Sequence, residues 1–249
     1  MQRYKLTLEY DGSGFVGWQR QINGLGVQEA IEQSIESFSG ESVTVFGSGR
    51  TDAGVHAMAQ VAHFDIKKVT DSDTVRDALN YYLKKGTISV LAAEAVSQDF
   101  HSRFSATNRS YLYRIVSRRG PISFDSGRVW WVPANLDVVA MRQASQVLVG
   151  KHDFSTFRAA ECQADGPVKT LDEIRVDQAP YPCGLEIRIH VRAKSFLYHQ
   201  VRNFAGSLKL VGEGRWSIND FETAFKATDR SQGGPTAPPE GLYFVKVAY

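Results

Sequence analysis

Alternation of apolar and polar residues is the feature that most limits how this chain can fold. Residues 185–191 place Leu, Ile, Ile and Val at every second position, and residues 4–10 do the same with Tyr, Leu, Leu and Tyr. A period of two is typical of a strand that buries one of its faces. The chain is therefore predicted to contain a sheet with an apolar face that other elements cover. The polar face of residues 185–192 is basic, which suits either contacts with phosphates or exposure to water.

Helical spacing predicts the elements that cover this sheet. Apolar residues recur three and four positions apart in five segments, at about 27–38, 71–84, 137–149, 196–212 and 217–227. Lys84-Lys85-Gly86 would end the second helix, Ser195 would cap the fourth, and Ser217 to Asp220 fits a capping box for the fifth. Further strands are expected at about 43–48, 58–65, 87–93, 110–117 and 242–247. This mixed order predicts an α+β protein with subdomains 1–105 and 106–249.

Size and composition bound the class of protein. A chain of 249 residues with 43% apolar residues can bury one large core or two ordinary ones, which excludes a disordered chain. The net charge of +2 is almost balanced, so a nucleic-acid partner would require basic residues gathered on one face. Cys162 and Cys183 lack the spacing of a metal site or a disulfide framework. Without a membrane-length apolar run or a signal peptide, a cytoplasmic location is expected.

A glycine-rich loop at residues 49–57 carries the strongest candidate for chemistry. Its sequence is Gly-Arg-Thr-Asp-Ala-Gly-Val-His-Ala, and it joins two predicted strands. Glycines let a backbone turn tightly or approach a ligand closely. Asp52, with Arg50 two residues before it, could stay ionised and act as a nucleophile or base. From spacing alone, an Asp that stabilises a turn through its own backbone is the more common case.

Three other segments mix aromatic residues with cations, at 15–21, 100–106 and 153–158. Such mixtures suit stacking on nucleobases together with contacts to phosphates. Aromatic residues in a structured loop are equally often part of a core. Composition leaves both interpretations open.

Residues 49–57 resemble in full the signature of the TruA family of tRNA pseudouridine synthases. Five further segments resemble that family in the same order: 10–12 with 15–21, then 100–106, 153–158, 196–203 and 241–243. Two departures are visible. Ser102 stands where the family commonly has Ala, and Gly166-Pro167 stands where a Ser-Pro pair is common. Neither departure lies in the signature.

The resemblance implies a fold of two ferredoxin-like subdomains. Their sheets would form one extended, mainly antiparallel sheet with helices on one face and a central active-site cleft. It also implies a homodimer in which one tRNA contacts both subunits. Two chains would then supply the clustered Arg and Lys residues that the small net charge of one chain does not suggest.

The activity implied is isomerisation of uridine to pseudouridine in the anticodon stem-loop of tRNA, at positions 38, 39 and/or 40. By resemblance Asp52 is the nucleophile, adding to C6 of the base or attacking C1′ of the sugar, and neither a metal nor a cofactor takes part. Arg202 would form an ion pair with Asp52, and Tyr111 would stack on the target base. Arg50 would fill the space that the flipped uridine leaves. The other residues expected to contact RNA or line the pocket are Arg20, His56, His101, Arg103, Arg158 and Leu242.

Two other functions are compatible with parts of this pattern. A non-catalytic RNA-binding protein could use the same fold, although the joint presence of Asp52, Tyr111 and Arg202 argues against it. An N-glycosidase could release uracil from RNA, which would leave abasic sites. Isomerisation, in contrast, leaves the mass of the RNA unchanged.

Overall fold

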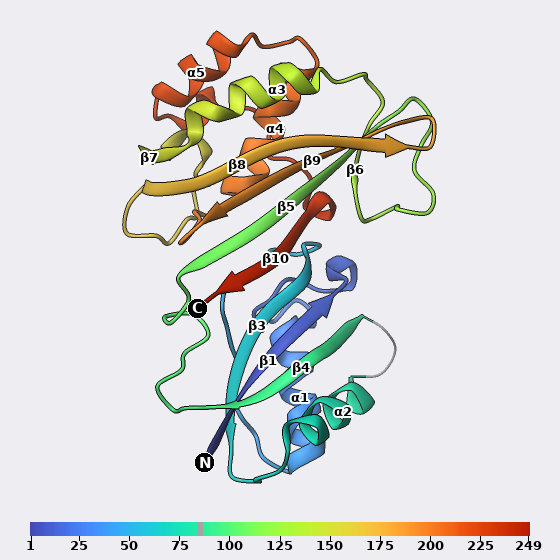
Figure 1. The fold of residues 1–249 in the computed structure, drawn as a ribbon, viewed down its shortest axis with the longest axis vertical. Helices are drawn as coiled ribbons and strands as arrows, with labels where there is room; N and C mark the ends of the chain where they lie inside the picture. Colours follow the sequence, from blue (N-terminus) through green and yellow to red (C-terminus); the bar gives the residue numbers. More distant parts are fainter. Residues whose placement is uncertain (84–86) are drawn as a thin grey trace. The chain divides into compact units, whose positions relative to one another are not determined.

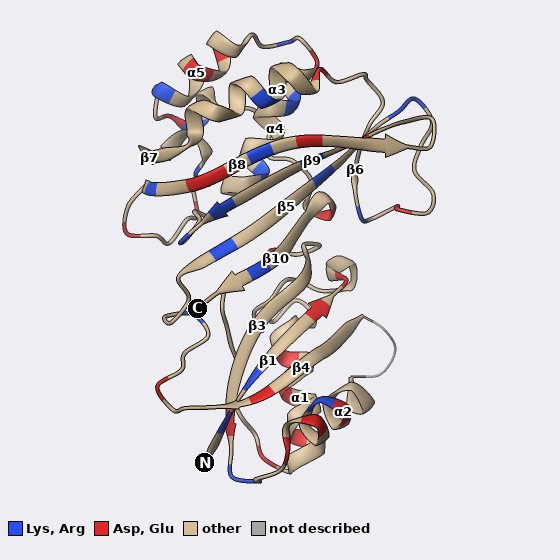
Figure 2. Ribbon diagram, viewed as in Figure 1, with Lys and Arg blue, Asp and Glu red and all other residues tan. Residues whose placement is uncertain are grey.

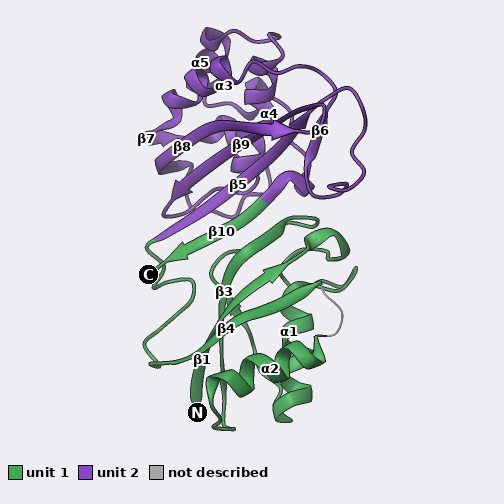
Figure 3. Cartoon of the chain, turned by 45° about the vertical axis from the view of Figure 1, so that its right-hand side comes forward, with its two compact units in different colours: residues 1–107, 243–249 green, residues 108–242 purple. Residues whose placement is uncertain are grey.

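The computed structural model describes residues 1–83 and 87–249 (Figure 1). Contacts divide the chain into two compact units, unit 1 with residues 1–107 and 243–249, and unit 2 with residues 108–242 (Figure 3). Together the described residues form ten strands, mostly antiparallel, and five α-helices. The predicted α+β class is thereby confirmed. No helix among these residues is long and apolar enough to cross a bilayer.

The sheet of unit 1 has the ferredoxin-like strand order β4-β1-β3-β2. These strands are β1 (Gln2–Tyr10), β2 (Phe46–Gly47), β3 (His56–Ile66) and β4 (Ile88–Val96). All three pairings between them are antiparallel. A fifth strand, β10 (Leu242–Ala248), pairs in parallel with the start of β3 through Tyr243 and Phe244. The last strand of the sequence thus completes the unit that holds the first.

Two helices cover one face of this sheet, α1 (Val27–Ser39) and α2 (Ser72–Tyr82), and they contact each other. Fully buried side chains from the strands and helices form the core: Tyr4, Leu6, Leu8, Ile31, Ile35, Val75 and Leu79. Asp71 caps α2 by accepting from the N–H of Thr74 at 2.8 Å. The expected Lys84-Lys85-Gly86 ending lies outside the described residues.

The predicted strand at 43–48 was too long. Only Phe46 and Gly47 form ladder pairs with β3, and the N–H of Ser48 adds one hydrogen bond to the carbonyl of Val61 at 2.7 Å. The backbone N–H of Val45 instead donates to the buried carboxylate of Glu32 on α1 at 3.0 Å, and its carbonyl accepts from Gln28 at 3.1 Å. Side chains of a helix therefore satisfy the backbone groups that a strand would have paired.

Unit 2 contains an antiparallel sheet in the order β5-β9-β8-β7. Its strands are β5 (Asn108–Ser117), β7 (Gly150–Asp153), β8 (Val168–Tyr181) and β9 (Gly184–Ala193), and β6 (Trp130–Val132) pairs in parallel with β5. Tyr111 and Tyr113 lie opposite Val191 and Ile189 of β9. Because Tyr113, Ile189 and Val191 are all buried, this row faces the core of the unit.

Three helices pack in unit 2: α3 (Val138–Ser145), α4 (Gln200–Gly212) and α5 (Ile218–Lys226). α3 contacts β8, α4 contacts β5, and α3 contacts both other helices. The capping box is confirmed, because Ser217 and Asp220 each accept from the other's backbone N–H, at 3.1 and 2.8 Å. The expected cap at Ser195 was wrong. His199 has a left-handed φ of 60°, which interrupts helical geometry, and α4 begins only at Gln200.

Candidate active site

Asp52 opens a tight turn that leads into β3. Its carbonyl oxygen accepts from the N–H of Val55 at 3.1 Å, and Gly54 adopts a φ of +78°. A residue with a Cβ atom is strained at this φ, so Gly54 allows the chain to reverse here. The side chain of Asp52 is half-buried, and Arg50 is exposed at the start of the loop. The residue types of the signature are thus compatible with a turn that presents a carboxylate.

The segment after β1 packs against the backbone of this turn. Gly17 forms an isolated β-bridge with Asp52, and the N–H of Trp18 donates to the carbonyl of Thr51 at 2.9 Å. A Cβ atom on Gly17 would lie 2.8 Å from that carbonyl oxygen, and its φ is +115°. Glycine at this position therefore lets the two backbones meet.

His56 lies beneath the loop with internal partners. It is 2% exposed, and its Nδ1 accepts from the N–H of Gly12 at 3.0 Å. The carboxylate of Asp11 is 3.3 Å from the same nitrogen, and the ring stacks on Tyr243 with centroids 4.8 Å apart. These contacts support a role in holding the loop. The predicted contact of His56 with RNA stays a prediction.

Arg20 neutralises a buried acid in unit 1. Its guanidinium is 2.5 Å from the carboxylate of Glu32, whose side chain is only 7% exposed. The Arg20 side chain itself is 64% exposed. Arg20 therefore has a clear structural partner on α1, beside any contact with RNA.

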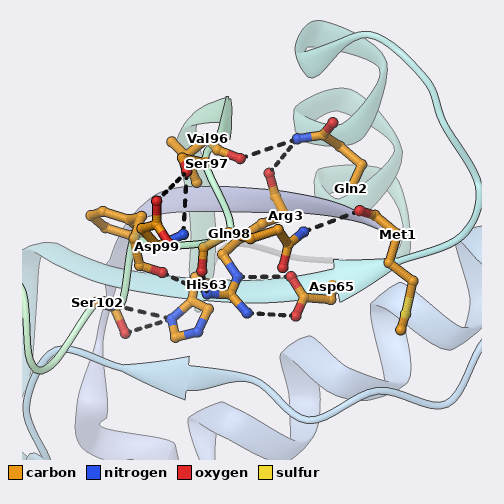
Figure 4. A network of polar contacts seen from close by, with 11 residues as sticks. Met1, Gln2, Arg3, His63, Asp65, Val96, Ser97, Gln98, Asp99 and Ser102 are labelled. Atoms are coloured by element: carbon orange, nitrogen blue, oxygen red, sulfur yellow. Dashed lines mark hydrogen bonds and ion pairs between the residues drawn. The ribbon is translucent and has the colours of Figure 1, made fainter.

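A network of polar contacts around Arg3 holds residues 97–105 against the strands of unit 1 (Figure 4). Arg3 binds Asp65 with two hydrogen bonds of 2.8 Å, and it also donates to the carbonyls of Gln98 and Phe100. His63 Nδ1 lies 2.9 Å from Ser102 Oγ, which donates to the carbonyl of Phe46 at 2.6 Å. An Ala at position 102 would lack this hydroxyl, so the departure from the family pattern adds a hydrogen bond.

Protonation of His63 is expected to destabilise the protein. Burial is the main reason that the pKa of His63 is lowered to about 4. The nearby positive charges of His101 and Arg3 also lower this pKa, whereas the negative charge of Asp65 raises it. Because this pKa lies below that of an unfolded His, stability is complete above about pH 6.5. It should fall by about 3 kcal/mol as the pH drops to 4.

A comparison with His63→Gln isolates this contribution. Urea unfolding measured at several pH values between 7.5 and 4 should show a steeper loss for the parent than for the variant, which keeps an acceptor but cannot be protonated. Parallel stability curves for the two proteins would contradict the prediction.

His101 and Arg103 lie in this same anchored segment. His101 Nδ1 accepts from the N–H of Arg103 at 3.1 Å, and its ring is 4.4 Å from that of Phe104. Phe104 is 76% exposed, and the guanidinium of Arg103 lies over its ring at 5.7 Å. A cation beside an exposed aromatic ring is suited to stacking on a base and binding a phosphate. The contact of His101 and Arg103 with RNA stays a prediction.

Tyr111 is placed by β5 and by the segment before α4. Its side chain is half-buried, and its ring meets the ring of Phe196 edge-on with centroids 5.1 Å apart. Its strand neighbour Val191 is buried in the core of unit 2. A rigid strand and one aromatic neighbour thus fix where this ring lies.

Arg202 lies in the first turn of α4 and is held by residues 234–237. Its Nε donates to the carbonyl of Ala237 at 2.8 Å, and the N–H of Ala237 donates back to the Arg202 carbonyl at 3.1 Å. One turn along the helix, a Cβ atom on Gly206 would lie only 1.7 Å from the carbonyl oxygen of Pro235. The irregular segment can approach Arg202 closely because position 206 has no side chain.

Arg158 and Leu242, also expected at the site, have internal contacts in unit 2. Arg158 donates to the carbonyls of Cys162 and Ala164 at 2.9 and 2.8 Å, which closes its own loop. Leu242 is 7% exposed. In the 160–168 loop, the carbonyl of Pro167 accepts from the N–H of Phe154 at 3.1 Å.

The basic face of β9 is balanced by acids. Arg188 and Arg114 both bind the carboxylate of Glu186 at 2.7 Å, and Arg192 binds Glu173 at 3.2 Å. Figure 2 shows acidic and basic residues side by side along β8. Because these cations already face carboxylates, the face is suited to water more than to a row of phosphates.

Among residues 1–83 and 87–249, no group of three or more His, Cys, Asp or Glu side chains is arranged to hold a metal ion.

A family model described as tRNA pseudouridine synthase matches residues 7–105 and 144–249. The match includes the Asp52 turn, the segments that hold it, and α4 with Arg202. The chain belongs to this family, which confirms the resemblance found in the sequence.

Full-length relatives narrow the assignment to one type within the family. The chain is 55% identical to a protein of Paramagnetospirillum magneticum and 56% identical to one of Rhodospirillum centenum. It is 53% identical to a protein of Sinorhizobium fredii. Each alignment covers all of this chain and 96 to 100% of the relative. All three relatives are named tRNA pseudouridine synthase A.

Proposed function

We propose that this protein isomerises uridine to pseudouridine in tRNA, with Asp52 as the nucleophile. Membership of the family and more than 50% identity to relatives named tRNA pseudouridine synthase A support the reaction. The observation that carries the choice of residue is the half-buried carboxylate on a turn whose backbone is held by Gly54 and Gly17. A fixed carboxylate is what attack on a nucleotide requires.

The reaction exchanges one bond for another within the same nucleotide. The N1–C1′ bond breaks, a C5–C1′ bond forms, the proton leaves C5 for solvent, and N1 gains a proton. Asp52 attacks C1′ or adds to C6, and its bond to the nucleotide breaks again before release. No water is consumed overall, so a second carboxylate of the kind that glycosidases use is not required.

Two residues of unit 2 keep the roles that the resemblance implies. Arg202 supplies the positive charge that keeps Asp52 ionised, and Tyr111 stacks on the target base. Their positions within unit 2 support these roles, since Arg202 is anchored to Ala237 and Tyr111 lies against Phe196. Arg50, exposed on the same loop as Asp52, replaces the stacking that is lost when the uridine flips.

The substrate region is the anticodon stem-loop, at positions 38, 39 and/or 40. Arg20, His101, Arg103 and Arg158 contribute the contacts with RNA, and the exposed ring of Phe104 supports this choice for residues 101–104. A homodimer would bring two sets of these cations to one tRNA, which suits a chain whose own net charge is only +2. The location that follows for a tRNA-modifying enzyme is the cytoplasm.

Release of tritium from C5 of uridine tests the proposed reaction. Unmodified tRNA labelled at C5 should lose tritium to water in the presence of the protein, and unlabelled tRNA treated in the same way should keep its mass. Intact binding of tRNA without tritium release would instead indicate the non-catalytic RNA-binding protein. Free uracil and abasic sites would indicate an N-glycosidase.

A further inference from the structure

Tyr10, the last residue of β1, contacts the residue that precedes Asp52. Its hydroxyl is 2.8 Å from Oγ1 of Thr51, although the two residues are 41 positions apart in the sequence. Tyr10 is 4% exposed and Thr51 is 7% exposed. Burial also raises the pKa of Tyr10 to about 12, so its phenol keeps its proton at neutral pH. The protonated phenol and the Thr51 hydroxyl can therefore share this hydrogen bond at neutral pH.

The same short segment is held at its other polar groups. The carbonyl of Thr51 accepts from the N–H of Trp18 at 2.9 Å. Gln60, which is fully buried on β3, donates to the carbonyl of Gly49 at 2.9 Å and accepts from the hydroxyl of Ser48 at 2.6 Å. The backbone leading to Asp52 is thus fixed at residues 48, 49 and 51. Tyr10 is the residue that fixes the side chain of Thr51.

We propose that Tyr10 is a positioning residue for the Asp52 carboxylate, acting through its hydrogen bond to Thr51. It has no role in the chemistry itself. A nucleophile must be held within a fraction of an ångström of its productive position, and small displacements cost large factors in rate. Loss of the Tyr10 hydroxyl releases the Thr51 side chain, so the residue before Asp52 is held at one point fewer, while the surfaces that contact RNA stay unchanged. This inference rests on the proposed role of Asp52 as nucleophile.

The test compares Tyr10→Phe with Tyr4→Phe. Tyr4 is a matched control because it lies on the same strand, is fully buried, and donates its hydroxyl proton to the carbonyl of Thr70 at 2.6 Å. Single-turnover rates at saturating enzyme should fall about tenfold or more for Tyr10→Phe, with tRNA affinity within twofold of the parent. Tyr4→Phe should keep the parental rate within twofold, even if it lowers the melting temperature as much as Tyr10→Phe does.

A second variant, Thr51→Val, tests whether Tyr10 acts through Thr51. It also replaces Tyr10→Phe in the experiment if that variant does not fold. It should lower the saturating rate as Tyr10→Phe does, and the double variant should lose no more than the worse single variant. The proposal is overturned if the rate of Tyr10→Phe stays within twofold of Tyr4→Phe. It is also overturned if the loss is confined to tRNA affinity, or if the two losses multiply. Full activity of Asp52→Asn would instead overturn the proposed nucleophile.

Discussion

Replacing Asp52 with Asn is expected to lower turnover at least about a thousandfold while leaving tRNA affinity within about tenfold. The amide cannot attack a nucleotide, so the covalent step is lost. Binding survives because it is spread over many phosphate contacts. The fold survives as well, since the turn is closed by the backbone carbonyl of Asp52 and by Gly54, which the substitution leaves in place.

Tritium release and tRNA binding, measured side by side, check this expectation. Asp77→Asn is a suitable control, because it changes the net charge equally and its side chain is 67% exposed on α2. The control should keep parental activity. Asp52→Asn with a rate near that of the parent would refute the assignment. A loss of binding as large as the loss of rate would show that Asp52 serves affinity more than chemistry.

The second large effect is expected for Gly206→Ala. Helix propensity alone predicts a gain of about 1 kcal/mol, because Ala is favoured over Gly inside a helix. The contact with Pro235 predicts the opposite, since a Cβ atom would lie 1.7 Å from a carbonyl oxygen. Backbone cannot yield as a flexible side chain can, so residues 234–237 must move away from α4. Arg202 would then lose its hydrogen bonds with Ala237.

We expect a loss of about 3 kcal/mol in stability, which is about 10 °C in melting temperature for a chain of this size, together with reduced activity. Thermal unfolding and tritium release measure the two effects. Gly120→Ala is the matched control, because a Cβ atom there meets nothing within 4 Å. A variant at position 206 that is as stable as the parent would contradict the close approach of the two segments.

Strands with a strict period of two were predicted from the sequence, whereas a strand with a bulge was not. β1 and β9 alternate without interruption, and both were expected close to their observed limits. β8 was missed although it has 14 residues. Its buried residues Leu171, Ile174 and Val176 are three and then two positions apart, because the register shifts at a bulge between Leu171 and Glu173. One extra residue is enough to erase a period of two.

Local spacing failed in a different way at the start of α4. Leu197 and Val201 are four positions apart, as in a helix, yet the backbone at His199 is left-handed. The capping Ser195 was therefore placed one turn too early. A local side-chain hydrogen bond stabilises this bend, since the amide side chain of Gln200 accepts from the N–H of Leu197 at 2.8 Å.

The family signature identified the candidate site from the sequence. The residues that hold this site in place could not be predicted in the same way. Periodicity placed Tyr10 on a strand but gave no reason to connect it with Thr51. The buried position of His56 was equally invisible, because a His in a polar loop suggests contact with a ligand. Both features depend on residues that meet only when β1 and β3 pair. Asp52, Tyr111 and Arg202 remain predictions that mutagenesis has to test.

The parallel pairing of β10 with β3 has a consequence for the order in which this protein matures on the ribosome. Tyr243, which stacks on His56 under the Asp52 turn, is made nearly two hundred residues after it. At usual rates of synthesis the interval is about ten to forty seconds. Tyr249 also hydrogen-bonds to Ser102, and Ala248 to Thr107. The contacts of the segment before β5 therefore form only after these residues have been made. The turn that carries the proposed nucleophile is thus synthesised well before the residues of β10 that support it, so its contacts are complete only after β10 has been made and has paired with β3.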